Sequence, residues 1–422
     1  MRQFLTFIFL SCFLGLAQAK PVELILWHSL AGSTGEELAK LVTGFNQSQK
    51  DYAVKLIYKG EYIETLTSFA AAFRAKQPPA IVQIFEVGTA TMLHPKGIIK
   101  PVDSLMDEQK LPLPKDHFLP ALRAFYSEEN QLQAMPFNAS IPVIFYNADA
   151  LEKLGYGENS FPQSWDEMEI LAEKLKNAGY SCAYTSAYPA WILIESFSAI
   201  NGLAMIQGKP LQANYNNAAI IHHLERLKRW QKQHYFEYGG RNSDATVLFT
   251  AGRCPMFSQS SGSYTSLAEL VKFHLGVALL PLDKNVSKIR NNNVAGGAAL
   301  WAVSGQNPAI YSGIAQFFSY IAKPEVQQAW QQGTGYLPLG TEGIYSAITK
   351  NHPILKLAKE DLANPQAKQT PQHLGPQNQI RIINDEALEA IFAGIKTPKQ
   401  AIDDAVRQSN YALKRFLRIT GE

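Results

Sequence analysis

The chain has 422 residues, of which 39 are lysine or arginine and 36 are aspartate or glutamate, so its formal net charge at pH 7 is +3. This near balance argues against nucleic acid or a membrane surface as a partner, because both are bound by strongly basic proteins. With 46% hydrophobic residues, the chain can build sizeable cores, in about two to three domains.

The N-terminus has the pattern of a secretory signal peptide. Arg2 precedes an apolar run from Phe4 to Leu16, and the small-residue tripeptide Ala17-Gln18-Ala19 follows. A basic residue, a short apolar core and small residues before the cut are what signal peptidase reads. We therefore expect residues 1–19 to be removed and the mature chain, from Lys20, to be exported to the periplasm. No later run reaches the ~18 apolar residues that a membrane span needs.

Cys182 and Cys254 are the only cysteines of the expected mature chain. In an oxidising compartment they either form a disulfide or remain two buried free thiols, and the sequence favours neither. Neither alternative makes a zinc site, because no other cysteine or histidine stands nearby at ligand spacing. Cys12 would be a lipidated N-terminus in a rival interpretation, but Phe9 stands where an aliphatic residue is wanted.

Strand and helix patterns alternate along the first part of the chain. Residues 23–27, 54–58 and 80–85 have strand patterns. Residues 35–47 and 62–76 carry apolar side chains at helical spacing. This alternation predicts an α/β lobe with a mostly parallel sheet, and binding residues are then expected at the carboxyl ends of its strands.

A second lobe is expected after the apolar stretch from Ile141 to Tyr146. Ser164 and Glu167 form the sequence pattern of a capping box at the start of a helix. Further helices are predicted over residues 216–234 and 397–417.

No pattern typical of an enzyme or a metal site is present. His222-His223 lacks metalloprotease spacing, and we expect both side chains at the surface. The serines of 260–263 lack the glycine that precedes the serine of a nucleophile elbow. A glycosidase-like carboxylate pair remains the enzyme alternative. The sequence thus favours a binding protein without a cofactor, a metal or catalytic residues.

Several polar or glycine-containing segments follow apolar stretches, namely residues 58–62, 86–89, 138–140, 258–263 and 295–297. Such loops offer hydroxyls, backbone N–H groups and a carboxylate to a ligand. Hydroxyls and glycine N–H groups can hold a phosphate without a basic surface. Arg381 is a candidate to complete the charge match, and its alternative is a surface salt bridge with Asp385 or Glu386.

The same segments carry a resemblance to a known family. The motifs are Trp27-His28-Ser29, Tyr58-Lys59-Gly60-x-Tyr62, Glu86 to Met92, Pro136-Phe137-Asn138, Ser260 to Ser263, Gly296-Gly297, Thr334 to Pro338 and Gln379-Ile380-Arg381. In this order they resemble the periplasmic sn-glycerol-3-phosphate-binding proteins of bacterial ABC importers, which are maltose-binding-protein-like solute-binding proteins.

The resemblance implies a periplasmic binding protein fold, with two α/β lobes that close by a hinge on a ligand between them. Lobe 1 would comprise residues 20–141 and 294–335, and lobe 2 residues 142–293 and 336–422. The chain would cross between the lobes near 141–146, near 294–301 and near Tyr336.

The resemblance also implies a set of ligand contacts, which fall on Tyr62, Glu86, Ser140, Ser260, Gly297, Tyr336 and Arg381. Arg381 would bind the phosphate with help from Ser140, Ser260 and the Gly297 N–H, while Glu86 would accept from the glycerol hydroxyls. Trp165 is expected beside the cleft. Tyr188 and Ile200 stand where relatives have tryptophan.

The expected partners are sn-glycerol 3-phosphate or a related phosphate ester and the permease subunits of the inner membrane, and the protein is expected to be a monomer. A sugar-binding protein of the same fold is the first alternative. A secreted phosphodiester hydrolase is the second.

Overall fold

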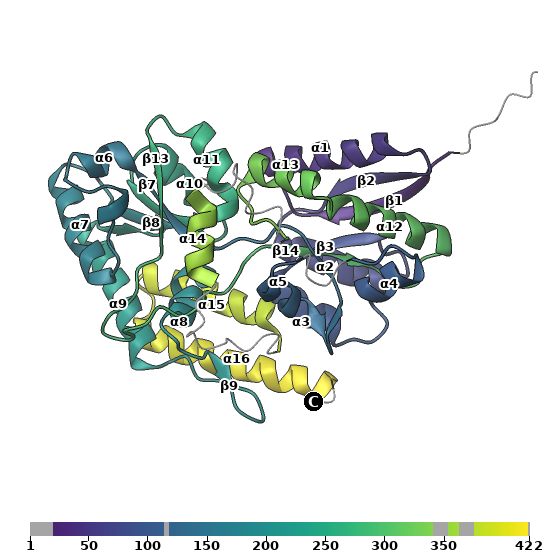
Figure 1. Ribbon diagram of the computed structural model, residues 1–422. Coiled ribbons are helices and arrows are strands. Elements are labelled where there is room, and N and C mark those ends of the chain that lie inside the picture. Colours follow the sequence, from purple (N-terminus) through teal and green to yellow (C-terminus); the bar gives the residue numbers. More distant parts are fainter. Residues whose placement is uncertain (1–19, 114–117, 341–352, 363–374, 421–422) are drawn as a thin grey trace, which may run out of the picture.

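The computed structural model describes residues 20–113, 118–340, 353–362 and 375–420. The expected signal peptide, residues 1–19, therefore lies outside the described residues. The chain forms two five-stranded sheets, and Figure 1 shows them in two α/β lobes that lie side by side, each with helices packed around its sheet. No helix of these described ranges is both long and apolar enough to cross a membrane.

The first sheet has the strand order β2-β1-β3-β14-β6. β1 pairs in parallel with β2 and β3, whereas β14 runs antiparallel to β3. The expected strands and helices of this region are confirmed, with ends that differ by a few residues. The elements are β1 (Val22–His28), α1 (Gly32–Ser48), β2 (Tyr52–Tyr58), α2 (Tyr62–Arg74), β3 (Ile81–Phe85), η1 (Glu86–Gly88), α3 (Thr89–Leu93), α4 (Val102–Glu108), α5 (Pro120–Phe125), β4 (Ser127–Glu128), β5 (Gln131–Leu132), β6 (Met135–Pro136), β14 (Ala298–Ala302), α12 (Pro308–Ile321) and α13 (Pro324–Thr334).

The second sheet has the order β11-β8-β12-β7-β13. β8 pairs in parallel with β11 and β12, and β7 runs antiparallel to β12 and β13. Its elements are β7 (Pro142–Asn147), α6 (Ala148–Glu152), η2 (Glu158–Ser160), α7 (Trp165–Asn177), β8 (Tyr184–Ser186), η3 (Ala190–Ser196), α8 (Phe197–Ile200), β9 (Ile206–Gln207), β10 (Gln212–Ala213), α9 (Ala218–Gln233), β11 (Phe236–Glu237), α10 (Thr246–Thr250), β12 (Met256–Ser260), η4 (Ser261–Ser263), α11 (Tyr264–Leu270) and β13 (Leu275–Leu279).

Three helices complete the described chain: α14 (Pro353–Leu362), α15 (Gln377–Phe392) and α16 (Pro398–Thr420). α15 and α16 pack on each other, and α16 also contacts α9. α15 in addition contacts η3 of the second lobe and η1, which directly follows β3 of the first. This helix therefore links the second lobe to the carboxyl end of a strand in the first.

The start of α7 confirms the predicted capping box. The Ser164 hydroxyl accepts from the Glu167 N–H at 3.3 Å, and the Glu167 carboxylate accepts from the Ser164 N–H at 3.1 Å. These bonds satisfy N–H groups that have no partner within the helix.

Cys182 and Cys254 form a disulfide. Each cysteine lies two residues before one member of the pair Tyr184 and Met256, which face each other in the parallel strands β8 and β12. The strand pairing thus brings the two thiols together, and it decides the alternative that the sequence leaves open in favour of the bond.

The segments that pass between the sheets lie side by side. Ser140 and Gly296 exchange two backbone hydrogen bonds of 3.0 and 2.9 Å, and the Leu337 N–H donates to the Ala139 carbonyl at 2.7 Å. The strands of the first sheet fall within the predicted lobe 1 and those of the second within lobe 2, while the exact boundaries stay a prediction.

Candidate functional site

The residues expected to bind ligand converge on these crossing segments. Gly297 has a φ of +100°, and a Cβ placed on it would lie 1.9 Å from the Asn138 carbonyl oxygen. Only glycine fits this close approach of two backbones. The Gly297 carbonyl in turn accepts from the Glu86 N–H at 3.0 Å, so the crossing segment lies directly against the carboxyl end of β3.

Arg381 joins the two lobes through a pair of carboxylates. From α15, its Nη1 donates to the Glu86 carboxylate of η1 at 2.6 Å. Its Nε and Nη2 donate to the two oxygens of Glu195 in η3, at 2.9 and 2.5 Å. The three side chains are only 9 to 15% exposed. The alternative partners, Asp385 and Glu386, do not make this ion pair.

Burial and mutual attraction set the protonation states here. Burial raises the pKa of Glu86, although the Arg381 guanidinium opposes that rise. Burial by itself would lower the pKa of Arg381, but Glu195 and Glu86 outweigh it and raise that pKa. The arginine therefore stays charged. One turn further along α15, burial raises the pKa of Asp385 to about 6 in spite of Arg381.

Arg381, Glu86 and Glu195 form one group in which a single guanidinium is shared between two carboxyl groups. It can accept hydrogen bonds from neutral hydroxyls and donate to their oxygens, but it does not make a positive site for a phosphate dianion. The expectation that Arg381 binds the phosphate is therefore not supported by its pairing.

Tyrosine hydroxyls gather on the other side of the crossing segments. The Tyr62 ring stacks on Phe85 with centroids 5.4 Å apart, and its hydroxyl accepts from Asn138 Nδ2 at 2.9 Å. Asn138 and Tyr62 also lie near the hydroxyl of Tyr336. Burial raises the pKa values of both tyrosines, so both keep their protons and can donate them to a ligand.

Glycine makes room for Tyr336. A Cβ on Gly262 would lie 2.4 Å from the Tyr336 ring. Gly262 belongs to η4, which directly follows β12, and its N–H donates to the Ser260 hydroxyl at 3.2 Å. Ser260, the last residue of β12, therefore lies close to Tyr336 on the third crossing segment. Ser140 is 1% exposed and lies on the first crossing segment.

All seven expected ligand residues thus come together from both lobes around the crossing segments, and we call this set with Asn138 and Glu195 the interlobe cluster. The sequence gives only a weak signal for Glu195, which directly follows the apolar run from Ala190 to Ile194. No sequence pattern predicts that Glu195 pairs with Arg381. Asn138 lies in a motif, yet its contact with Tyr62 depends on the fold.

Two aromatic residues, Trp191 and Tyr188, lie near the cluster. The Trp191 ring lies 2.4 Å from where a Cβ on Gly296 would stand. Tyr188 is 6.4 Å from Trp191 between ring centroids and lies near Tyr62.

Trp165 lies in the hydrophobic core of the second lobe. It is 2% exposed, and its indole packs against Tyr184, His223 and Trp230 with centroids 6.1, 4.6 and 6.0 Å away. This is the core of the second lobe, so its position does not favour a place beside a ligand. The surface prediction for His223 is wrong, because that ring is fully buried, whereas His222 is exposed as expected.

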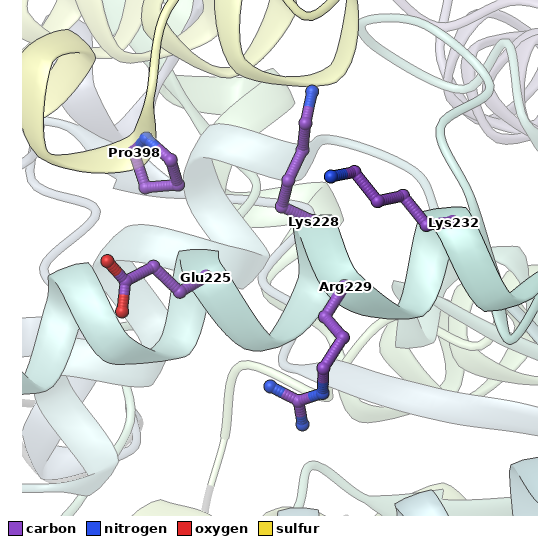
Figure 2. Close-up of a pocket in the computed structure, with 5 residues that line it drawn as sticks. All are labelled: Glu225, Lys228, Arg229, Lys232 and Pro398. Atoms are coloured by element: carbon purple, nitrogen blue, oxygen red, sulfur yellow. The ribbon is translucent and has the colours of Figure 1, made fainter.

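Other features of the described residues give no second site. A hollow of about 200 Å³ lies along α9 and the start of α16, and none of its lining residues belongs to the interlobe cluster (Figure 2). Its lining residues are Glu225, Lys228, Arg229, Lys232 and Pro398. Cys182, Cys254 and Glu237 lie close enough together to suggest a metal site, but the sulfurs are bonded to each other and Glu237 pairs with Arg253.

Comparison with known proteins gives a family. The family model of bacterial extracellular solute-binding proteins matches residues 40–356. The sn-glycerol-3-phosphate-binding periplasmic protein UgpB of Escherichia coli K12 is 37% identical over 426 residues, covering 96% of this chain and 97% of that protein. The protein of the same name from Pectobacterium atrosepticum is 36% identical, covering 96% and 94%.

Solved structures share the fold. UgpB from Mycobacterium tuberculosis in complex with glycerophosphocholine has a TM-score of 0.80 and 20% identity, covering 94% of this chain and 99% of that chain. Maltose-bound MalE3 of T. maritima has a TM-score of 0.79 and 16% identity, covering 93% and 99%. The two-lobed α/β arrangement is thus that of the maltose-binding-type proteins, and the chain belongs to the bacterial extracellular solute-binding protein family.

Proposed function

We propose that this protein is the periplasmic substrate-binding component of an ABC importer, and that it captures sn-glycerol 3-phosphate or a glycerophosphodiester and delivers it to the membrane permease. The observation that carries the proposal is the interlobe cluster, in which neutral hydroxyl donors and an ion-paired arginine from both lobes meet at the crossing segments. Relatives that are 37% identical over 96% of the chain are named for sn-glycerol 3-phosphate, which supports this ligand class.

The charges of the cluster suggest how the ligand lies. Arg381 is neutralised by two carboxylates, so the Glu86–Arg381 pair is suited to the glycerol hydroxyls, which both donate and accept. The phosphate is then left to the uncharged donors, which are the hydroxyls of Tyr62, Tyr336, Ser140 and Ser260 and the Gly297 N–H. This proposal keeps all seven predicted residues and moves Arg381 from the phosphate to the glycerol end.

Capture would proceed without chemistry. The ligand contacts residues from both sheets, so bound ligand favours the closed arrangement of the lobes, and the closed protein presents itself to the permease. We propose a monomer in the periplasm that binds no nucleic acid and needs no cofactor.

Calorimetric titration of the mature protein tests the proposal. The ligands are sn-glycerol 3-phosphate, glycerophosphocholine, inorganic phosphate and maltose. We expect binding of at least one glycerol phosphate ester and none of maltose. Binding of maltose alone would instead identify a sugar-binding protein.

A second assay separates binding from hydrolysis. The protein is incubated with glycerophosphocholine and free choline is measured over time. We expect the ester to remain intact, and steady release of choline would identify a phosphodiesterase.

A further inference from the structure

A chain of buried amides leads from the first sheet to the tyrosines of the interlobe cluster. The Ser29 N–H, after β1, donates to Gln83 Oε1 in β3 at 2.8 Å. Gln83 Nε2 donates to Asn138 Oδ1 at 2.8 Å, and Asn138 Nδ2 donates to the Tyr62 hydroxyl at 2.9 Å. Gln83 is 1% and Asn138 0% exposed, so water does not compete for the bond between these two amides.

The direction of this chain is fixed at its first link. A backbone N–H can only donate, so the Gln83 oxygen must face Ser29 and its NH2 group must face Asn138. The Asn138 oxygen must then face Gln83, which turns the Asn138 NH2 group toward the tyrosines. The orientation of a side-chain amide is assigned from its hydrogen-bond network. Here the network begins at the Ser29 backbone N–H, which can only donate.

The proton count at the tyrosines follows from this direction. Asn138 Nδ2 donates to the Tyr62 oxygen at 2.9 Å, and the Tyr336 hydroxyl lies near both groups. The Tyr62 oxygen therefore accepts from the amide. The Tyr62 proton cannot be donated to the amide nitrogen, so it goes either to the ligand or to Tyr336, whose own proton is then donated to the ligand.

We propose that Gln83 and Asn138 are positioning residues, which act through Tyr62 and Tyr336 to orient a phenol O–H toward an anionic oxygen of the ligand. The inference rests on the proposed function, because it takes the ligand to be a phosphate ester. With this positioning role, specificity for an anionic ligand depends on Gln83, which the ligand does not contact.

Reversing the direction of this chain of hydrogen bonds tests the inference. In Gln83→Glu both side-chain oxygens accept, so the Asn138 amide must turn its NH2 group toward residue 83 and its oxygen toward the tyrosines. The Tyr62 phenol then donates to Asn138 rather than toward the ligand. Loss of a hydrogen bond to a charged group weakens binding by roughly 10- to 100-fold, and calorimetry with sn-glycerol 3-phosphate or glycerophosphocholine measures it.

A double-mutant cycle separates positioning from general damage and from the added charge. Gln83→Leu breaks the chain without charge, and we expect it to weaken ester binding in the wild-type background but much less in a Tyr62→Phe, Tyr336→Phe background. Asn46→Ala is the control, because Asn46 also makes two hydrogen bonds in the first lobe, both to the Val54 backbone. It should leave the affinity unchanged.

The outcomes distinguish the two proposals. If the wild type binds an ester and both Gln83 variants bind it equally well, or if Gln83→Leu has the same effect in both backgrounds, the positioning role is wrong and the proposed function stands. If the wild type binds neither ester, the proposed function is overturned, and the role of the amides with it.

Discussion

Arg381 holds together two carboxylates that would otherwise repel each other in a buried place. In Arg381→Ala, Glu86 and Glu195 lose their shared partner, and the Glu86–Arg381 contact between the lobes disappears. We expect the affinity for the ester to fall by ~2–5 kcal/mol, the range for truncating one partner of a buried, hydrogen-bonded charge pair. Calorimetric titration checks this.

The matched control is Arg407→Ala. Arg407 pairs with Asp404 on the surface, where its side chain is 72% exposed, and exposed pairs contribute little. Equal affinity in the wild type and in Arg407→Ala is expected. Undiminished affinity in Arg381→Ala would remove Arg381 from the site.

His223 makes stability depend on pH. Its ring is fully buried, stacks on Phe197 at 3.9 Å between centroids, and burial lowers its pKa well below the usual 6.5. Below about pH 6.5 the unfolded chain binds a proton at this residue that the folded chain does not. Stability is therefore full above that pH and falls as pH falls, by up to about 1.4 kcal/mol per pH unit.

His223→Phe should flatten this dependence. We expect the free energy of unfolding in urea to fall less between pH 7 and pH 5 in the variant than in the wild type. His222→Phe, on the exposed side of α9, should keep the wild-type dependence. An unchanged slope in His223→Phe would show that the ring is not held neutral.

At the scale of elements, the η4 turn after β12 must stay small to let Tyr336 approach. A methyl group on Gly262 would lie 2.4, 2.7 and 2.8 Å from atoms of the Tyr336 ring, so Gly262→Ala must displace the ring or the turn. We expect lower ester affinity and a stability loss of about 1–3 kcal/mol, typical of overpacking. Titration and thermal unfolding measure the two effects.

Gly157→Ala is the comparison for this substitution. No atom lies within 4 Å of the added methyl group there, and the residue has a negative φ of −146°. Both affinity and stability should stay near the wild-type values. If Gly262→Ala behaves in the same way, the close approach of the turn to Tyr336 has no role in binding.

The sequence predicts elements well where one local pattern decides them. The strands β1, β2 and β3 and the capping box at Ser164 follow from short local patterns, so they are found within a few residues of their observed ends. Arg381 shows the limit. Local position suggests Asp385 or Glu386 as partner, but its carboxylates come from residues 86 and 195, which only the packing of α15 against η1 and η3 brings near.

Trp165 and His223 show the same limit for burial. The resemblance places Trp165 beside the ligand, and the polarity of histidine suggests a surface position for His223. In the fold the two rings lie 4.6 Å apart in the core of the second lobe. A neutral imidazole can substitute for an apolar ring when aromatic side chains surround it, and no periodicity in the sequence distinguishes that case.

At the scale of the whole molecule, the second lobe contains a covalent cross-link, whereas the contacts between the lobes at the interlobe cluster are non-covalent. The disulfide between Cys182 and Cys254 lies entirely within the second lobe and spans 72 residues of sequence. The contacts between the lobes at the interlobe cluster are instead hydrogen bonds and an ion pair, which ligand binding can remake. The disulfide thus stabilises the second lobe without restricting the movement of the two lobes relative to each other.

The double variant Cys182→Ser, Cys254→Ser tests this division. Without the bond the unfolded chain gains freedom, so we expect the free energy of unfolding to fall by about 2–4 kcal/mol. The affinity for the ester should stay near the wild-type value at 25 °C, because neither sulfur belongs to the interlobe cluster. A thiol assay on the unfolded, unreduced wild-type protein should find no free thiol, and two free thiols would contradict the disulfide. A large loss of affinity in a variant that is still folded would instead show that the stability of the second lobe and the geometry of the site are coupled.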